Sequence, residues 1–263
     1  MKIRILSDLH LHINKENNAP NYSNDDILTI IAGDISDNID QCENWLKKNF
    51  QRVIFIEGNH VAYSIRNKSL HKIYREYRKR FPINSNYSFL QNNFKIVDDC
   101  IFVGCTLWTD FSFVYPGTNF APWEYGKKYL QVSPSGQGLY RTWYGKLHPF
   151  TVKFLKHEHD RSIKFIKKIC KKFADRKIVL IVHHAISPQA VAPEFANYPY
   201  HSASINDHEG LIKQYQNLKI VIHGHVHQTH QYMIGNTSVY CNPLGIAIKN
   251  ENPDYIKNLI IDI

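Results

Sequence analysis

The chain has 263 residues, of which 43% are hydrophobic, and this is enough for one large α/β domain with a sizeable core. No apolar run is long enough to span a bilayer or to serve as a signal peptide, so we expect a cytoplasmic protein with no membrane partner. The formal net charge of +9 permits anionic partners such as nucleotides or nucleic acid, but a basic composition alone does not require one.

Short apolar runs rich in β-branched residues alternate with helical patterns along the chain. The runs that we expect to form strands are residues 3–6, 27–32, 53–56, 101–103, 178–182, 220–222, 238–241 and 259–261. Helical periodicity is found at residues 39–49, 67–81 and 164–173. This alternation predicts an α/β fold with helices outside the sheets. The short connections near the C-terminus predict an antiparallel or mixed portion there.

Residues 111–150 have a different character. They are dense in aromatic side chains, contain several prolines and glycines, and show little periodicity. A long irregular connection of this kind is usually functional. Two interpretations remain open: a surface excursion held by its own aromatic cluster, or a cap over a binding cleft. We therefore expect a single domain over residues 1–263, with an aromatic-rich insertion or cap at about 111–150.

Five of the expected strands are followed directly by Asp, Asn or His. These residues are Asp8 and His10, Asp34 and Asp37, Asn59 and His60, His183 and His184, and His225 and His227. Because ligands bind at the carboxyl ends of strands in α/β sheets, these side chains can converge on one site. Such mixed oxygen and nitrogen ligands suit Mn, Fe, Co, Ni or Zn. The candidates exceed the three or four protein ligands of one zinc site, and they therefore predict two adjacent ions.

The motifs also occur in a familiar order. They are Asp8-x-His10, Gly33-Asp34-x-x-Asp37, Gly58-Asn59-His60, His183-His184 and Gly224-His225-x-His227. Together they resemble the calcineurin-like metallophosphoesterase superfamily. More narrowly, residues 105–110, the HHA sequence at 183–185 and the CNPLG sequence at 241–245 are similar to small bacterial and phage members. The resemblance implies a four-layer α/β/β/α sandwich of two mixed β-sheets flanked by helices.

The resemblance further implies a centre of two divalent ions (Mn, Fe, Zn, Ni or Co), among which we favour Mn. It implies the following ligands: Asp8, His10 and His227 on one ion, Asn59, His183 and His225 on the other, and Asp34 bridging both. His60 resembles the family's general acid, or the group that stabilises the developing charge. Val61 stands where the family usually has Asp or Glu, and this departure puts the orientation of His60 in doubt.

Several neighbouring residues have other interpretations. We prefer His183 over His184 as the metal ligand because His183 continues its strand, and we assign His184 to substrate binding. Arg66, at the start of a basic helix that follows His60, is a second candidate for substrate binding. Asp37 is expected to cap the next helix or to accept a hydrogen bond behind the ligands. His12 is unusual because the narrower relatives often carry an acidic residue near this position.

These observations predict a hydrolase that acts on phosphate esters. A hydroxide activated by the two ions would attack a phosphodiester or phosphomonoester, and a nucleotide-like ester is one candidate substrate. A nuclease with the same metal centre is the alternative. The positive charge favours it slightly, but no accessory nucleic-acid domain is visible. A non-catalytic metal-binding scaffold is a third alternative, against which the complete ligand set and His60 both argue.

Overall fold

The structure is a computed structural model of the protein. The described residues are 1–18, 22, 25–64, 68–114, 117, 121–133, 137–142, 144–195 and 197–263. Among the helices in these ranges, none combines the length and the hydrophobicity that crossing a lipid bilayer requires. Arg66, which the sequence suggested for substrate binding, lies outside the described residues.

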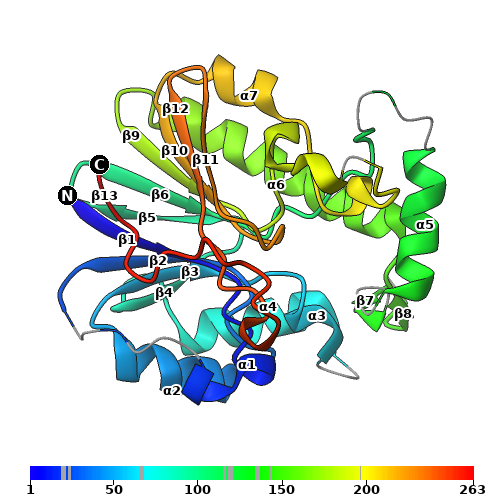
Figure 1. Ribbon diagram of the computed structural model, residues 1–263, viewed down its shortest axis with the longest axis horizontal. Helices are drawn as coiled ribbons and strands as arrows, with labels where there is room; N and C mark the ends of the chain where they lie inside the picture. The colour runs from blue at the N-terminus through cyan, green and yellow to red at the C-terminus, as the bar shows by residue number, and fades with distance from the viewer. Residues whose placement is uncertain are drawn as a thin grey trace.

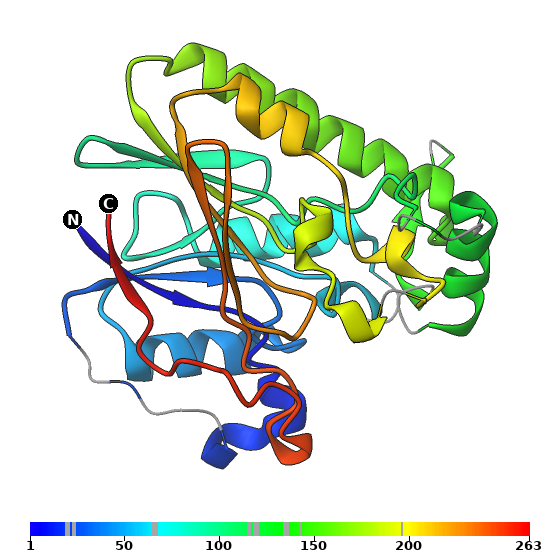
Figure 2. The ribbon, with the colours of Figure 1, turned by 45° about the horizontal axis from the view of Figure 1, so that its top comes forward.

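Two large sheets face each other and carry helices on their outer sides (Figure 1). The first sheet has the order β13 (Ile260–Asp262), β1 (Lys2–Leu6), β2 (Leu28–Ala32), β3 (Val53–Ile56) and β4 (Tyr87–Phe89). Its strands pair in parallel, except that β13 runs antiparallel to β1. The two chain termini meet at this edge, where the Ile263 N–H donates to the Met1 carbonyl at 3.0 Å (Figure 2).

The second sheet has the order β11 (His230–Ile234), β12 (Thr237–Cys241), β10 (Leu218–His223), β9 (Lys177–Ile181), β6 (Cys100–Gly104) and β5 (Asn93–Val97). Its four inner strands are parallel, and both outer strands pair antiparallel with their neighbours. The expected mixed portion near the C-terminus is therefore present.

The central strands are buried on both faces. Since successive side chains point to opposite sides of a strand, each of these strands contributes to two separate cores. In β2, Ile30 belongs to the core between the two sheets, where it joins Phe102 and Ile181 of the second sheet. Its neighbour Ile31 instead packs in the core beneath the helices. The result is a four-layer arrangement of helix, sheet, sheet and helix (Figure 1), as the sequence predicted.

Helices cover the outer face of each sheet (Figure 1). The first sheet carries α1 (Leu11–Asn18), α2 (Ile39–Asn49), α3 (Val61–Ser64) and α4 (Leu70–Arg80). The second carries α6 (Val152–Lys172) and α7 (Glu209–Gln214). The expected cap of α2 was wrong in one detail: Asn38, not Asp37, accepts the N–H groups of Asp40 and Gln41. Asn38 is the N-cap because it immediately precedes the first helical residue, Ile39.

The aromatic-rich segment contains more regular structure than its sequence suggested. It forms helix α5 (Pro122–Val132) and a hairpin of β7 (Leu139–Arg141) and β8 (Leu147–Pro149) at one end of the sandwich (Figure 1). A glycine inside α5 obscured the helical pattern. A Cβ atom at Gly126 would lie 2.4 Å from the Phe111 ring, so close packing of this helix requires glycine there.

Candidate active site

The carboxyl ends of five strands bring the sequence-predicted residues together. Asp8 and His10 follow β1, Asp34 follows β2, Asn59 and His60 follow β3, His183 follows β9, and His225 and His227 follow β10. The strands belong to both sheets, so the site lies where the two sheets meet at one end of the sandwich. Three groups of side chains that could each hold an ion are found among the described residues: Asp8 with His10 and His227, Asp8 with Asp34 and His183, and His10 with His12 and His60.

The backbone of this region adopts a conformation that ordinary residues rarely use. The residues with left-handed φ angles are Asp8 (50°), His10 (43°), Asp34 (52°), His225 (71°) and His227 (51°). Each such conformation costs about 1–3 kcal/mol outside glycine, and such residues cluster at functional sites. The sharp turns allow side chains from the ends of different strands to point into one small volume.

Two glycines permit this convergence by lacking a side chain. A Cβ atom at Gly58 would lie 2.1 Å from Asp34 Oδ1, and one at Gly224 would lie 2.3 Å from Asp8 Oδ2. Neither contact can be relieved easily, because both carboxylates are buried and held by backbone N–H groups. The Gly-Asn-His and Gly-His motifs therefore need glycine for space around the carboxylates.

The first cluster consists of Asp8, His10 and His227. The Nε2 atoms of the two histidines are 3.0 Å apart, and they lie 3.9 Å and 3.4 Å from Asp8 Oδ1. On its other side, His227 Nδ1 lies 2.8 Å from Glu251 Oε2. Such a carboxylate orients a metal-binding imidazole and leaves its second nitrogen directed at the ion. Glu251 had no motif to reveal it, because the chain returns to the site only through the loop after β12.

The second cluster consists of Asn59, His183 and His225, with Asp34 beside it. Asn59 Oδ1 lies 2.8 Å from His183 Nε2 and 3.0 Å from His225 Nδ1. His183 Nε2 also lies 3.2 Å from Asp34 Oδ2. The other nitrogen of His183 is placed to donate to the Ala32 carbonyl at 2.9 Å, which directs Nε2 towards the cluster.

His184 takes a different place from His183. Its side chain is only 2% exposed, and its ring packs against those of Trp108 and His225 at centroid distances of 5.4 and 4.4 Å. Burial lowers the pKa of His184 to about 3, so this imidazole is neutral at pH 7. Packed against the His225 ring, His184 can restrict the orientation of that candidate ligand. Its role in substrate binding stays a prediction.

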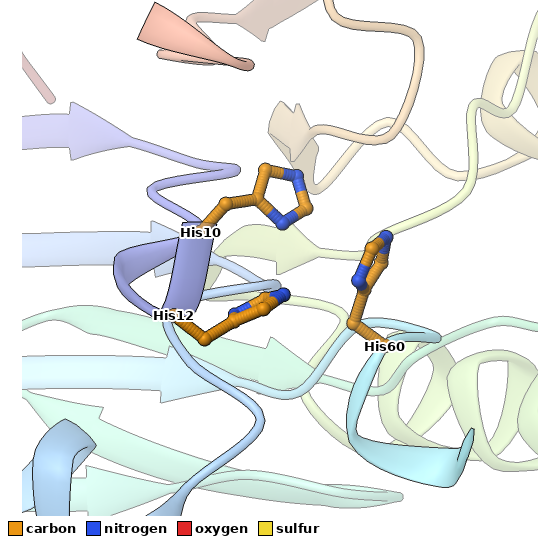
Figure 3. Close-up of side chains that lie close together, drawn as sticks. All are labelled: His10, His12 and His60. Carbon is orange, nitrogen blue, oxygen red and sulfur yellow. The ribbon is translucent and has the colours of Figure 1, made fainter. Parts of the chain in front are cut away.

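His60 points towards the two clusters without joining either of them. Its backbone N–H donates to Asp34 Oδ1 at 3.1 Å, and its Nε2 lies 3.9 Å from Asp34 Oδ2. Figure 3 shows its ring facing those of His10 and His12, at centroid distances of 4.5 and 5.5 Å. Val61 is fully buried in the core beneath the helices, so this position serves packing rather than orientation of His60.

His12 is a residue whose place the sequence did not predict. Its Nδ1 lies 3.7 Å from Asp37 Oδ1, and its ring is one of the three imidazoles that converge in Figure 3. The only sequence signal was that His12 lies two positions after His10. His12 lies in the first turn of α1 and His10 immediately before that helix, and the rings of His10, His12 and His60 could together hold one ion.

The buried charges of the site determine one another's protonation. Burial would raise the pKa of Asp8, but the hydrogen bond with His227 and the nearby imidazoles lower it to about 2. Burial would lower the pKa of His227, but its bonds with Asp8 and Glu251 raise it to about 10. In the same way, the Asp34 carboxylate outweighs burial and raises the pKa of His183 to about 9. Without an ion, two imidazolium groups therefore balance the two buried carboxylates.

A divalent ion fits this arrangement. His10 is fully buried, and its Nδ1 has no hydrogen-bond partner among the described residues, while its Nε2 faces His227 Nε2. Two imidazole nitrogens directed at each other beside a carboxylate form the donor set that borderline divalent ions prefer. A bound cation would replace the protons of His183 and His227 as the balancing charge.

We expect metal binding to release protons. At pH 7, His183 and His227 carry protons because their folded pKa values lie above 7, and neutral imidazole is needed to bind an ion. Loading the metal-free protein should release about two protons, one from each of these imidazoles, and the affinity should rise with pH up to about 9–10. Calorimetric titration with Mn²⁺ in buffers of different ionisation enthalpy measures this number.

Glu251→Gln provides the matched variant for this experiment. It removes the hydrogen bond that helps to raise the pKa of His227, so proton release should fall towards one. Metal affinity should fall by about 10–100-fold, as is typical when a supporting carboxylate is lost. Binding without any proton release in the wild-type protein would contradict these assignments.

Comparison with known proteins identifies relatives of this arrangement. The family model of calcineurin-like phosphoesterases matches residues 1–229. A search of curated proteins found no significant match. The crystal structure of a phosphopantetheinyl hydrolase from Mycobacterium tuberculosis is similar, with a TM-score of 0.72, 18% sequence identity, and coverage of 94% of this chain and 90% of that chain.

A second solved structure is that of a candidate 5′-nucleotidase from Staphylococcus aureus. It aligns with a TM-score of 0.50 and 13% identity, and the match covers 92% of this chain and 48% of that one. At these identities the two likenesses show the fold alone. They agree with the two mixed sheets and flanking helices described above.

Proposed function

Because the chain belongs to the calcineurin-like phosphoesterase family and is thus a metal-dependent hydrolase, we propose that it hydrolyses a phosphomonoester or phosphodiester at a centre of two divalent ions. Manganese is the metal that we favour. The observation that carries the proposal is the pair of neighbouring clusters linked by Asp34, whose Oδ2 lies 3.2 Å from His183 Nε2. Each cluster has its own imidazole with a raised pKa, His227 in the first and His183 in the second, so each could exchange its proton for one ion.

The residues of the clusters divide between two positions. We assign Asp8, His10 and His227 to one ion, Asn59, His183 and His225 to the other, and Asp34 to both. Ions bound there supply Lewis acidity for the phosphate oxygens and for the attacking water. The protein fixes the ligand atoms through the left-handed turns, the Ala32 carbonyl and Glu251, so little reorganisation is needed during the reaction.

His60 is assigned to the leaving group. It is 27% exposed at the side chain, while Asp8 and Asp34 are buried, so His60 lies on the open side of the site. The hydrogen bond from the His60 backbone N–H to Asp34 Oδ1 fixes the backbone position from which the His60 side chain extends. From this place the protonated imidazole can donate its proton to the departing alkoxide. The rings of His10 and His12 lie beside the His60 ring, at centroid distances of 4.5 and 5.5 Å.

A screen of phosphate esters with the Mn²⁺-loaded protein tests this function. The panel should contain nitrophenyl mono- and diesters, mononucleotides, dinucleotides, DNA and phosphopantetheine esters, with release of phosphate or alcohol as the readout. We expect turnover that disappears with a chelator and returns with Mn²⁺. Absence of turnover for every ester, with both ions bound, would instead support a non-catalytic scaffold.

The nuclease alternative has one feature in its favour. A cavity of about 600 Å³ beside α4 and the β7–β8 hairpin is lined by Lys72, Arg75 and Arg141 and by one carboxylate, Glu76. Its three cations outnumber this carboxylate and suit a phosphate backbone. DNA cleavage that falls after Arg75→Ala, while nitrophenyl ester turnover stays unchanged, would favour the nuclease. We place a small ester first because the cavity beside the candidate ligand His225 is lined mainly by apolar residues and carries no Lys or Arg among the described residues.

We also propose that residues 111–150 cap the site. Helix α5 packs on the 3₁₀ turn His201–Ala203, where Ser202 Oγ donates to the Pro122 carbonyl at 3.0 Å and Tyr125 and Tyr129 contact the Tyr200 ring. His201 in this turn lines the cavity next to His225. The segment therefore supports a wall of the site from its outer side.

Trp123→Ala tests the cap. Trp123 is 39% exposed on α5 and lines a groove against the N-terminal end of α6. Loss of this ring should loosen α5 and raise KM by roughly 3–10-fold, a cost of about 1 kcal/mol in substrate binding, while the metal content stays unchanged. Unchanged KM in Trp123→Ala would mean that the segment is only a surface excursion. Trp143, the other tryptophan of this segment, lies outside the described residues.

A further inference from the structure

A cavity of about 350 Å³ opens directly beside the second cluster of candidate ligands. His225, Val226 and Gln228 of the turn after β10 line it from one segment of the chain. The segment of residues 190–205 provides the rest of the lining, including Phe195 and Tyr198. His225 belongs both to the cavity lining and to the cluster around Asn59, so the cavity adjoins the proposed metal centre.

The lining is mainly apolar and carries no Lys, Arg, Asp or Glu among the described residues. His201 does not offer a free donor for an anion, because its Nε2 is bound to the Phe195 carbonyl at 2.6 Å. Gln228 Nε2 is directed at Glu194 Oε1 at 3.3 Å, so the nearest charge at this rim is negative. A second phosphate or a nucleic-acid backbone would find no cationic side chain in this lining, and it would be repelled by Glu194.

Two aromatic side chains at the cavity remain partly in water. Phe195 is 50% exposed and Tyr198 is 44% exposed, although both lie next to buried apolar residues such as Ile205. Covering apolar surface stabilises a complex by about 25 cal/mol for each Å² removed from water. An apolar ligand group in the cavity would therefore gain binding energy from these two rings.

We propose that this cavity binds the uncharged, largely apolar organic group of a phosphate ester, and that Phe195 and Tyr198 determine specificity for that group. The phosphate would lie at the proposed metal centre, and in this respect the inference rests on the proposed function. The cavity volume lies at the lower end of the range for small-molecule sites, so it suits a group of moderate size. Compact polyanions are excluded by the same lining.

Binding of phosphonates, which cannot be hydrolysed, tests the inference independently of turnover. The full-length Mn²⁺-loaded protein is titrated calorimetrically with methylphosphonate, phenylphosphonate and phosphonoacetate. We expect phenylphosphonate to bind about 10–100-fold more tightly than methylphosphonate, the usual effect of burying one apolar ring. Phosphonoacetate, whose organic group is anionic, should bind no better than methylphosphonate.

Phe195→Ala and Tyr198→Ala should each reduce the preference for phenyl over methyl to less than about 3-fold. Both variants should keep the affinity for methylphosphonate and the metal content. Tyr144→Ala is the matched control, because Tyr144 is 90% exposed and does not line the cavity, and the preference should be unchanged there.

The inference is overturned if the wild-type protein binds methyl- and phenylphosphonate equally, or if the preference survives in both aromatic variants. Loss of methylphosphonate binding in Phe195→Ala and Tyr198→Ala would also overturn it, because these residues would then support the site as a whole. If the phenyl preference is found but no phosphate ester is hydrolysed, the binding inference stands and the proposed hydrolytic function fails.

Discussion

Asp34→Asn should lower turnover of a phosphate ester by more than about 100-fold. Asp34 is only 2% exposed, and its carboxylate lies between the clusters, with Oδ2 3.2 Å from His183 Nε2 and Oδ1 bonded to the His60 N–H. Loss of a residue that merely supports a ligand costs about 10–100-fold, and a ligand shared by two ions should cost more. Asparagine has nearly the same shape, so the loss would come from the missing charge.

Two measurements distinguish this effect from a folding defect. The metal content of Asp34→Asn should fall below two equivalents, while its circular dichroism spectrum stays that of the wild-type protein. Asp99→Asn is the matched control, since Asp99 is 72% exposed beside Lys177, far along the chain from any candidate ligand. An Asp34→Asn protein that keeps both ions and normal turnover would show that this carboxylate is not shared.

His60→Ala should keep both ions but lose about 10²–10⁴-fold in turnover, the usual scale of general acid catalysis. The His60 side chain is not part of either proposed ligand set, and its backbone N–H to Asp34 remains in the variant. The loss should shrink for esters with good leaving groups such as nitrophenolate, because these leave without a proton. Since Val61 packs in the core and cannot orient His60, we expect an effect near the lower end of this range.

The control for this prediction is His157→Ala on the exposed face of α6, which should have normal turnover with every ester. His60→Ala is then compared across leaving groups of widely different pKa. An equal loss for all of them would assign His60 to phosphate binding or to charge stabilisation, not to proton donation. Loss of an ion in His60→Ala would place His60 among the ligands.

The sequence predicted the inner strands and the convergence of the motifs because both depend on short-range patterns. Most residues of the inner strands are apolar, and each motif follows such a largely apolar run. Strands β5 and β11 were not predicted, because as edge strands they are half exposed and lack such a run. Helix α5 was not predicted because Gly126, which its packing against Phe111 requires, interrupts the helical pattern.

Other features of the site depend on contacts that are distant in sequence. Glu251 reaches His227 only because the loop after β12 returns to the site, and no local pattern announces this contact. The cavity wall includes the short 3₁₀ turns Pro188–Ala190, Pro193–Phe195 and His201–Ala203, which carry no periodicity for the sequence to reveal. The meeting of His12 with His60 requires β1 and β3 to end at the same edge of one sheet.

The metal content of the wild-type protein tests the central claim most directly. The metal-free protein is reconstituted with excess Mn²⁺, freed of unbound ion and examined by elemental analysis. We expect close to two equivalents of Mn per chain, because two clusters of buried ligands share Asp34. A content that stays at one equivalent under excess Mn²⁺ would contradict the dinuclear centre and the bridging position of Asp34.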